Sequence, residues 1–310
     1  MHYNTKHRHE IKDKEMRKIG VVLTEADDWT ATAILKNIRD KGAEAVALNL
    51  AQIGVSITNA GLYWLNETED INGMDGVIVR DVGISNLLDL ISVKFDLIRI
   101  FEIERHTTVM NSSVAIQNAA NKFLSFVLFQ RAHLPLPPTV VTADLEVAKR
   151  VIEDFGSVLV KPIFGSQGKG IIKLEGYEYN PKVAALLKDR GVLYLQQFVH
   201  NPGRDIRVFV VGETALGAIY RVTPPGSFRS NLSQGGSPRK CELTEELCEL
   251  AVRATKAVGA DFAGVDLIES ADGLYLLEIN ATPSARGIKL ACGIDVTEKI
   301  VDLLFTRLKR

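Results

Sequence analysis

The stretch from Phe262 to Asn280 reads FAGVDLIESADGLYLLEIN, and it decides how the chain can fold. Two apolar runs flank a turn at Asp272-Gly273, which is typical of a β-hairpin. Side chains alternate between the two faces of a strand, so Glu278 and Asn280 share one face. Burying such groups among aliphatic residues is costly unless they are hydrogen-bonded or bind a cation. Oxygen ligands of this kind suit Mg²⁺, so the pattern predicts a metal site.

The length of the turn decides whether Asp266 joins this site. A two-residue loop at Asp272-Gly273 would place Asp266 opposite Ile279, on the wrong face. A three-residue loop that starts at Ala271 places it opposite Glu278, with Gly273 free to adopt the left-handed conformation of the last loop position. We therefore expect the three-residue loop, although ordinary polar positions on a half-exposed hairpin would give the same pattern. The expected metal ligands are Asp266, Glu278 and Asn280.

Bulk properties point to a soluble globular protein. The chain has 310 residues, of which 46% are hydrophobic, enough for two or three subdomains around a sizeable core. Its formal net charge of −1 gives no reason to expect nucleic acid or a membrane surface as a partner. No apolar stretch approaches the ~20 residues that span a bilayer, and the N-terminus lacks an apolar signal-peptide core. Cysteines without metal-site spacing are typical of free thiols in the cytoplasm, which is the expected location.

The order of predicted elements divides the chain into an α/β fold with α+β subdomains. Strands at 19–23, 45–48 and 76–79 with intervening helices predict a small parallel domain. One helix is expected over 115–133, followed by prolines that break the chain. A strand-rich unit closes the chain, with helices over 245–258 and 296–308. The expected units are a flexible extension over 1–18, with Met16 as a second possible start, then 19–110, 111–192 and 193–310.

A glycine-rich turn lies between the expected strands 158–160 and 171–174 and reads KPIFGSQGKG from Lys161 to Gly170. It is neither a P-loop nor a dinucleotide fingerprint, because no Lys-Ser/Thr pair follows the final glycine and no helix opens after it. Glycines let backbone amides approach phosphate oxygens closely, and Lys161 would supply a positive charge. We interpret the turn as a flexible lid, with a solvated glycine hairpin as the alternative. Lys122, early in the expected helix, would by itself be an ordinary surface lysine.

Two further polar stretches suit a nucleotide. The strand that ends at Gln196-Gln197-Phe198-Val199 could offer backbone donors and acceptors to an adenine ring. Asp205 follows, where it could accept a hydrogen bond from a ribose hydroxyl. The loop GSFRSNLSQGG, from Gly226 to Gly236, combines arginine, asparagine and glycines, which suits a polyanionic transition state. A generic polar loop is the alternative.

Together these stretches resemble the ATP-grasp superfamily and, within it, the RimK-like α-L-glutamate ligases. The resemblance runs from about residue 111 to the C-terminus and is weaker before that. It implies an ATP-grasp fold, in which an N-terminal parallel α/β domain precedes two lobes that enclose the nucleotide. It rests on Asn121-Lys122, Leu159-Val160-Lys161-Pro162 with its glycine lid, Gln196-Gln197-Phe198-Val199, Asp205-Ile206-Arg207, Phe228-Arg229-Ser230-Asn231 with Gly235-Gly236, Ala263-Gly264-Val265-Asp266 and Glu278-Ile279-Asn280-Ala281-Thr282-Pro283.

The resemblance implies a role for each matching position. Gln197 stands where the family often has Glu, but its amide can still accept a hydrogen bond from the adenine amino group. Asp266, Glu278 and Asn280 would hold two Mg²⁺ ions, which Mn²⁺ could replace. The implied catalytic residues are Arg229, Arg207 and Asn231. The implied ATP-binding residues are Lys122, Lys161, Gly165, Ser166, Gln167, Gly168, Gly170, Gln196, Gln197, Phe198, Val199, Asp205, Arg229, Ser230 and Asn231.

The implied enzyme is an ADP-forming ligase that joins the α-amine of L-glutamate to an acidic small molecule. The stretches at 121–124, 161–165 and 233–236 are most similar to the archaeal branch that acts on tetrahydromethanopterin. A deazaflavin cofactor tail, a ribosomal protein C-terminus and an amino-group carrier protein are alternative acceptors. A non-catalytic ATP-binding regulatory module is the alternative from another class. The chain could also form a homo-oligomer.

A small acidic acceptor needs cationic groups and a flat apolar wall. Guanidinium groups suit carboxylates because they bind them through two parallel hydrogen bonds. We expect a closed-ended cleft that at least two of four arginines face, although each arginine singly could be a solvated surface charge. The arginines are Arg80, Arg221, Arg239 and Arg286, and the expected ring contacts are Tyr220 and Phe228.

Overall fold

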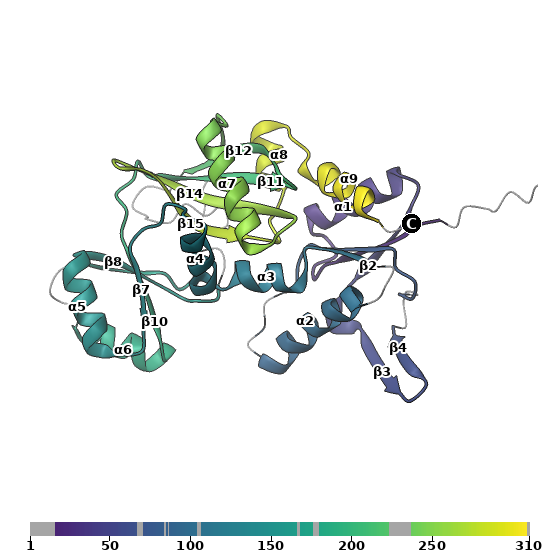
Figure 1. The fold of residues 1–310 in the computed structure, drawn as a ribbon, viewed down its shortest axis with the longest axis horizontal. Helices are drawn as coiled ribbons and strands as arrows, with labels where there is room; N and C mark the ends of the chain where they lie inside the picture. The colour runs from purple at the N-terminus through teal and green to yellow at the C-terminus, as the bar shows by residue number, and fades with distance from the viewer. Residues whose placement is uncertain are drawn as a thin grey trace, which may run out of the picture.

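The structure, a computed structural model, describes residues 16–66, 71–83, 85, 87–103, 107–165, 168–175, 180–222 and 237–308. These residues form a parallel four-stranded sheet, two antiparallel sheets of four and five strands, and a two-stranded hairpin. The second sheet lies at one end of the molecule and the N-terminal domain at the other, with the third sheet between them (Figure 1). No helix in these ranges is long and apolar enough to cross a membrane.

The N-terminal domain is the expected parallel α/β unit. Its sheet has the order β2-β1-β5-β6, built from β1 (Lys18–Val22), β2 (Glu44–Leu48), β5 (Gly76–Val79) and β6 (Thr108–Met110). One face packs against α1 (Trp29–Asp40) and the distant α9 (Val296–Arg307), and the other against α2 (Leu88–Ile103). The carboxyl ends of β1 and β5 therefore lie side by side, and their following loops face the rest of the chain.

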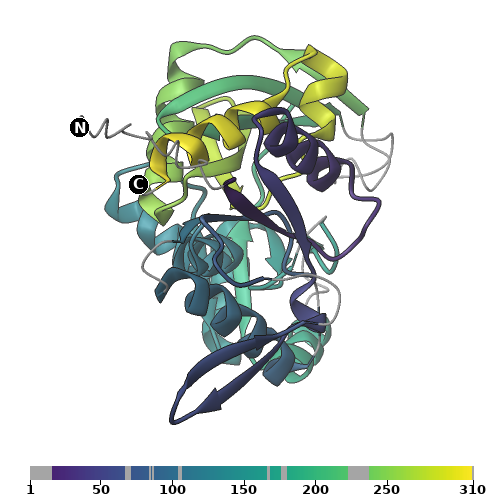
Figure 2. The same ribbon diagram turned by 90° about the vertical axis from the view of Figure 1, so that its right-hand side faces the viewer.

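The β3–β4 hairpin (Gly54–Thr58 and Gly61–Leu65), which follows the short helix η1 (Leu50–Gln52), projects from this domain (Figure 2). The sequence interpretation missed it. Its side chains are half-buried or exposed on both strands, so no buried alternation marks it in the sequence.

The second sheet has the order β7-β10-β8-β9. Its strands are β7 (Thr139–Thr142), β8 (Ser157–Lys161), β9 (Ile172–Glu175) and β10 (Leu193–Gln197), and α5 (Leu145–Phe155) and α6 (Asn180–Arg190) cover one face. The expected division after residue 192 falls within this sheet, because β10 pairs with both β7 and β8. Leu193 and Leu195 complete the core under α5, a nonlocal pairing that local sequence does not reveal.

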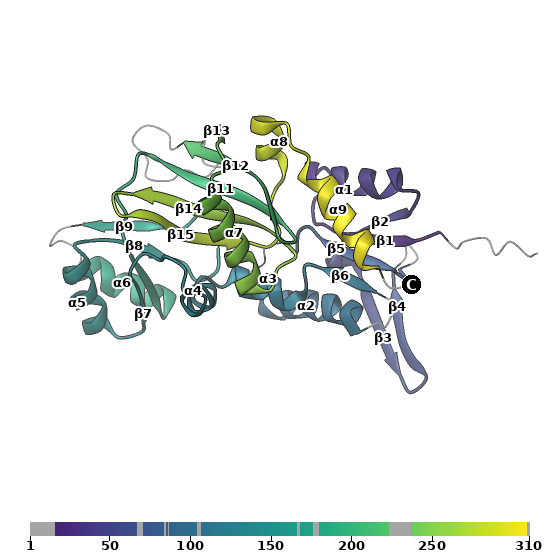
Figure 3. The ribbon, with the colours of Figure 1, turned by 45° about the horizontal axis from the view of Figure 1, so that its top comes forward.

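The third sheet has the order β13-β12-β11-β14-β15. Its strands are β11 (Arg204–Val211), β12 (Thr214–Val222), β13 (Ser237–Cys241), β14 (Phe262–Ser270) and β15 (Gly273–Asn280). The helix α7 (Glu245–Val258), at the positions that the sequence predicts, crosses one face of this sheet (Figure 3). The short helix α8 (Arg286–Cys292) packs at one end of the other face, over Phe209 and Ile219. The remainder of that face carries the polar residues considered below.

The turn between β14 and β15 differs from the expected one. Ser270 pairs with Gly273, so the loop holds only Ala271 and Asp272, and the three-residue loop was wrong. The pairing of Asp266 with Glu278 was nevertheless correct, because a β-bulge between Asp266 and Leu267 inserts one extra residue on β15. The bulge, which the sequence interpretation missed, shifts the register by one residue. This shift offsets the one-residue error in the loop length.

The helix expected over 115–133 is two helices, α3 (Ser113–Ala120) and α4 (Lys122–Arg131). Asn121 between them has an extended backbone, and its side chain accepts a hydrogen bond from the amide of Leu124 at 3.0 Å. An asparagine side chain can replace the intrahelical bond in this way and start a new helix. Lys122 is therefore the first residue of α4, between the second and third sheets.

Asn111, at the junction after β6, ties the N-terminal domain to the third sheet. It is fully buried, its Nδ2 donates to the carbonyl of Phe262 at 2.8 Å and to that of Ala281, and its Oδ1 accepts from the amide of Phe262 at 3.2 Å. One amide thus satisfies backbone groups at the start of β14 and just after β15, which a buried position requires.

Asn111→Ala should strongly destabilise the protein, because it leaves buried backbone groups without partners. Each such group costs about 1–3 kcal/mol, so we expect a loss of about 3 kcal/mol in the free energy of unfolding, measured by urea denaturation. Gln117→Ala is the control, since this α3 side chain only accepts an exposed bond from Arg99. Equal stability of the two variants would contradict the assignment.

Candidate active site

Charged side chains gather on one face of the third sheet. In the strand register, Asp205 on β11 lies opposite Arg221 on β12, and Arg207 on β11 lies opposite Asp266 on β14. Asp266 in turn lies opposite Glu278 on β15. Directly opposed residues share a face, so these five side chains lie on one face of four strands, with Asp205 and Arg207 two residues apart on β11.

Asp266 is held by two guanidinium groups. Arg207 donates from Nε to Oδ1 at 2.7 Å and from Nη2 to Oδ2 at 2.8 Å, and Arg221 donates from Nη2 to Oδ2 at 2.8 Å. Burial alone would raise the pKa of Asp266, but the charges and hydrogen bonds of Arg207 and Arg221 outweigh it and lower the pKa. Asp266 is therefore ionised although only 4% of its surface is exposed.

Arg221 also binds Asp205 through two bonds, Nε to Oδ1 at 2.6 Å and Nη2 to Oδ2 at 2.7 Å. Burial would lower the pKa of Arg221, but Asp266 and Asp205 outweigh it and hold the pKa above its ordinary value. The residue predicted to contact a ribose, Asp205, thus has its carboxylate engaged by an arginine and is itself buried. Arg221, predicted to face an acceptor, lies inside this network.

A second cluster joins the second sheet to the third. Lys161 at the end of β8 donates to Oε1 of Gln196 at 2.5 Å, and Gln196 donates to the hydroxyl of Thr139 at 3.1 Å. Lys122 at the start of α4 donates to the carbonyl of Gly165 at 2.8 Å, and its Nζ lies 3.6 Å from Oε1 of Glu278. Both predicted nucleotide lysines are buried and converge on the same side as Glu278.

The pKa of Lys161 is lowered to about 8, because burial and, to a smaller extent, the charge of Lys122 outweigh the opposing charge of Glu278. Together the two clusters hold the cations Lys122, Lys161, Arg207 and Arg221 against the anions Asp205, Asp266 and Glu278. Positive charge is in excess, which suits a polyanionic ligand such as a nucleotide phosphate chain.

The predicted metal ligands share one face at the edge of the third sheet. Gly264 pairs with Asn280 and Asp266 with Glu278, so Glu278 and Asn280 lie in successive positions on that face. The Glu278 side chain is 33% exposed, and Asn280 accepts bonds from the amide and hydroxyl of Thr282. Among the described residues no three His, Cys, Asp or Glu side chains converge. Two carboxylates and an amide fit Mg²⁺, which completes its octahedron with phosphate oxygens and water.

The adenine-contacting segment predicted from the sequence follows β10. The amides of Gln197 and Phe198 donate to the carbonyls of Pro138 and Ser157, at 2.9 and 2.8 Å. Nζ of Lys173 lies 3.9 Å from the centre of the Phe198 ring, so one face of that ring is covered. Within the described ranges the amide of Val199 makes no hydrogen bond, which leaves it as the donor of this segment.

The glycine lid is described only in part. Gly168 and Gly170 have positive φ angles of 69° and 74°, as expected for glycines in a turn, and the carbonyl of Gly170 accepts from Nη2 of Arg190 at 2.8 Å. Gly165 accepts from Lys122, as noted above. Several predicted residues lie outside the described residues, namely Ser166, Gln167, Phe228, Arg229, Ser230 and Asn231.

The four arginines, at least two of which were predicted to face a cleft, lie in different surroundings in the structure. Arg239 pairs with Tyr220 on β12, and Tyr220 belongs to the opposite, α7-covered face, where Arg204 stacks on its ring at 3.9 Å. Arg286 is exposed at the start of α8, and Arg221 is buried.

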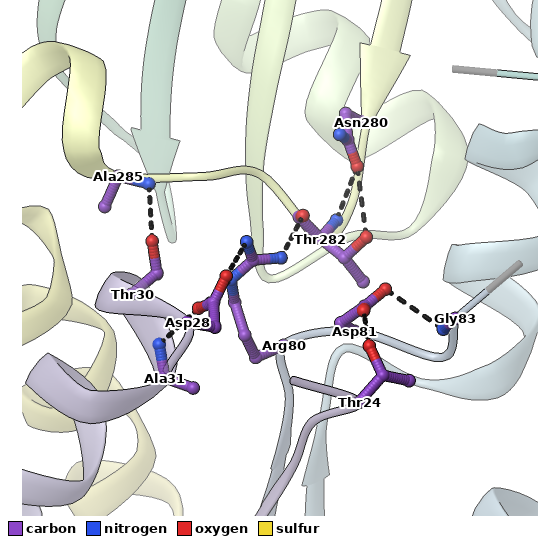
Figure 4. Close-up of polar contacts among 10 residues, drawn as sticks. All are labelled: Thr24, Asp28, Thr30, Ala31, Arg80, Asp81, Gly83, Asn280, Thr282 and Ala285. Atoms are coloured by element: carbon purple, nitrogen blue, oxygen red, sulfur yellow. Dashed lines mark hydrogen bonds and ion pairs between the residues drawn. The ribbon is translucent and has the colours of Figure 1, made fainter. Parts of the chain in front are cut away.

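Arg80 was predicted to bind an acceptor, but it bridges Asp28 and the carbonyl of Thr282, beside Asn280 (Figure 4). The sequence interpretation quoted Thr282 within the motif at residues 278–283 but gave it no role, and it did not name Asp28. The position of Thr282, two residues after Asn280, was the available signal.

Comparison with known proteins agrees with this geometry. A model of the RimK-like ATP-grasp domain matches residues 119–304. Tetrahydromethanopterin:α-L-glutamate ligase of Methanosarcina acetivorans is 41% identical, over 93% of this chain and 99% of that protein. The protein of the same name from Methanococcus maripaludis is 32% identical, over 91% and 96%. A probable α-L-glutamate ligase of Trichodesmium erythraeum is 31% identical, over 93% and 95%.

Solved structures support the fold. The ATP-grasp ligase PsnB, in complex with a phosphomimetic variant of its minimal precursor, Mg and ADP, superposes with a TM-score of 0.75 at 23% identity, covering 94% of this chain and 98% of that chain. The macrocyclase MdnC of Microcystis aeruginosa, bound to its precursor peptide, superposes with a TM-score of 0.71 at 14% identity, over 93% and 99%. The predicted fold class is confirmed. The chain therefore belongs to the RimK-like ATP-grasp family and is an ATP-grasp ligase.

Proposed function

We propose that this ligase joins the α-amine of L-glutamate to a carboxylate of an acidic small molecule, a tetrahydromethanopterin-type cofactor. The carrying observation is the convergence of Asp266 and Glu278, on adjacent strands, with the two buried lysines. Supporting the acceptor is the name of a relative that is 41% identical over 93% of this chain. The proposal assigns ATP as the co-substrate and Mg²⁺ as the resident metal.

The reaction has two bond exchanges. An oxygen of the acceptor carboxylate takes the terminal phosphoryl group of ATP, and ADP leaves. The glutamate amine then attacks the acyl carbon, loses a proton, and expels phosphate as the amide forms. Neither step requires a nucleophilic side chain, so the protein's work is positioning, charge stabilisation and exclusion of water.

The chain's own residues would divide this work as follows. Lys122 and Lys161 would bind the phosphates, because both ammonium groups are buried close to Glu278, which is a proposed metal ligand. Arg207 would stabilise negative charge next to Asp266, since its side chain is 18% exposed and that of Arg221 is only 4% exposed. Mg²⁺ held by Asp266, Glu278 and Asn280 would neutralise phosphate charge. Arg229, Ser230 and Asn231 stay proposed phosphate and acyl-site residues on sequence resemblance.

Glu278→Gln should abolish turnover while the protein stays folded, because a neutral amide replaces a half-exposed metal-binding carboxylate. Groups that merely support ligands cost 10–100-fold when mutated, so we expect a drop in kcat of at least about 100-fold. Glu269→Gln is the matched control, since Glu269 on β14 makes an ion pair with Arg204 outside the site. Wild-type rates of ADP release from Glu278→Gln would show that the metal assignment is wrong.

Affinity for a non-hydrolysable ATP analogue should weaken as the pH rises through about 8, where Lys161 loses its proton. The unfolded chain keeps that proton to higher pH, so stability contributed by this group rises over the same range in which binding falls. A Lys161→Arg variant stays charged and should bind with a flatter pH profile. Fluorescence titrations on both sides of pH 8 test this, and a flat wild-type profile would refute the role of Lys161.

The acceptor is tested by following ADP release with L-glutamate against a panel of carboxylates. Release should be tightly coupled to amide formation with tetrahydromethanopterin. Deazaflavin cofactor, a ribosomal-protein C-terminal peptide and an amino-group carrier protein are the competing acceptors in the same panel. Robust glutamylation of one of these, with none of the pterin, would overturn the acceptor and leave a ligase. Tight ATP binding with no ADP release for any acceptor would favour a regulatory module.

A further inference from the structure

The loop that follows β15, Ala281 to Ala285, is fastened to the N-terminal domain at two points, Arg80 after β5 and Thr30 in α1 (Figure 4). The carbonyl of Thr282 accepts from Nη1 of Arg80 at 3.0 Å. The amide of Ala285 donates to the buried hydroxyl of Thr30 at 3.0 Å. Both anchors come from the N-terminal domain, 202 and 255 residues earlier in the chain.

The guanidinium of Arg80 has little freedom. It donates from Nε to Oδ1 of Asp28 at 3.1 Å and from Nη2 to Oδ2 at 2.8 Å, with the two side chains 11% and 24% exposed. Asp28 is itself fixed, because its Oδ1 caps α1 by accepting from the amide of Ala31 at 2.6 Å. A two-bond pair of this kind sets the plane of the guanidinium and leaves Nη1 aimed at Thr282.

Thr282 passes this constraint to Asn280. The amide of Thr282 donates to Oδ1 of Asn280 at 2.8 Å, and its hydroxyl donates to the same oxygen at 3.2 Å. That oxygen is the only atom of the Asn280 side chain suited to a hard cation, and it has two lone pairs. Where Asn280 points is therefore set by where the main chain of Thr282 lies.

We propose that Arg80 is a positioning residue for the metal site, acting through the carbonyl of Thr282 to orient Asn280. It rests on the proposed role of Asn280 as a metal ligand. When metal binds, the longer bond from the Thr282 hydroxyl gives way and the amide bond remains, so the anchored main chain presents the oxygen already oriented. Without Arg80, the side chain of Asn280 has to be ordered when the metal binds. The cost of that ordering reduces the net free energy of binding, so the affinity for the metal falls.

The loop should survive the loss of Arg80. Ala281 stays bound to Asn111 through its carbonyl, and Ala285 stays bound to Thr30. Only Thr282 loses its anchor, so Arg80→Met isolates the step from Arg80 to Asn280. Arg17→Met is the matched control, because Arg17 makes an ion pair with Asp75 at the other end of the same parallel sheet.

Binding of Mn²⁺ is measured from the electron paramagnetic resonance signal of the free ion, with a non-hydrolysable ATP analogue present. Arg80→Met should raise the apparent Kd for Mn²⁺ about tenfold, and Arg17→Met should leave it unchanged. Arg80→Lys should recover part of the affinity, since lysine can reach one partner but cannot bridge both. Under turnover, half-saturating Mg²⁺ should rise while kcat at saturating metal changes little.

Asp28→Asn is the second variant, in case Arg80→Met does not fold, because asparagine still caps α1 but loses the ion pair. It should weaken Mn²⁺ binding in the same direction and to a smaller extent. If Asn280→Ala weakens Mn²⁺ binding and the Arg80 variants do not, the positioning role is overturned and the metal assignment stands. If Asn280→Ala leaves Mn²⁺ binding unchanged, the metal assignment itself fails.

Discussion

The carboxylate of Asp266 can be both buried and charged only because two guanidinium groups share it. A buried anion without partners would cost several kcal/mol and would take up a proton instead. Arg207 and Arg221 remove that cost, and each in turn needs the sheet register that places it opposite an acid. The arrangement of β11, β12 and β14 is therefore tied to one charge. Removing a member leaves a buried neighbour with one opposite charge fewer, which is more damaging than losing a surface ion pair.

Charged side chains also connect two sheets from different parts of the chain in one site. The second sheet contributes Lys161 and Gln196, and the third contributes Asp266 and Glu278. Lys122 at the start of α4 contacts Gly165, in the turn after β8, and Glu278. The length of the Lys122 side chain therefore limits the distance between Gly165 and Glu278. The break at Asn121 is what brings Lys122 to this position, since a continuous helix would direct the first turn of α4 elsewhere.

The sequence predicts local features well and nonlocal ones poorly. The caps and stops of α7, Thr244 and Gly259, are read directly because capping depends on neighbouring residues. The pairing of Asp266 with Glu278 was found through an incorrect turn, since the compensating bulge has no sequence signal. The local sequence gives no sign that Asp205 and Arg221 are buried, but the register across two strands buries them against each other. No local pattern states that pairing, and the same holds for β10 in the second sheet.

The packing of α9 on the N-terminal domain has a consequence for the order of folding. Ile19, Ile34 and Ile38 share a core with Ile300 and Leu304, so one face of the first sheet is covered by one of the last helices (Figure 3). During synthesis, the part of this face that α9 covers stays exposed until α9 has left the ribosome. Contacts of such long sequence separation form late, because the entropy lost on closing the long loop opposes folding before the contacts stabilise the structure. A nascent chain that stops before residue 296 would therefore expose an aliphatic surface that is prone to aggregation. Partly folded chains of this kind are bound by chaperones.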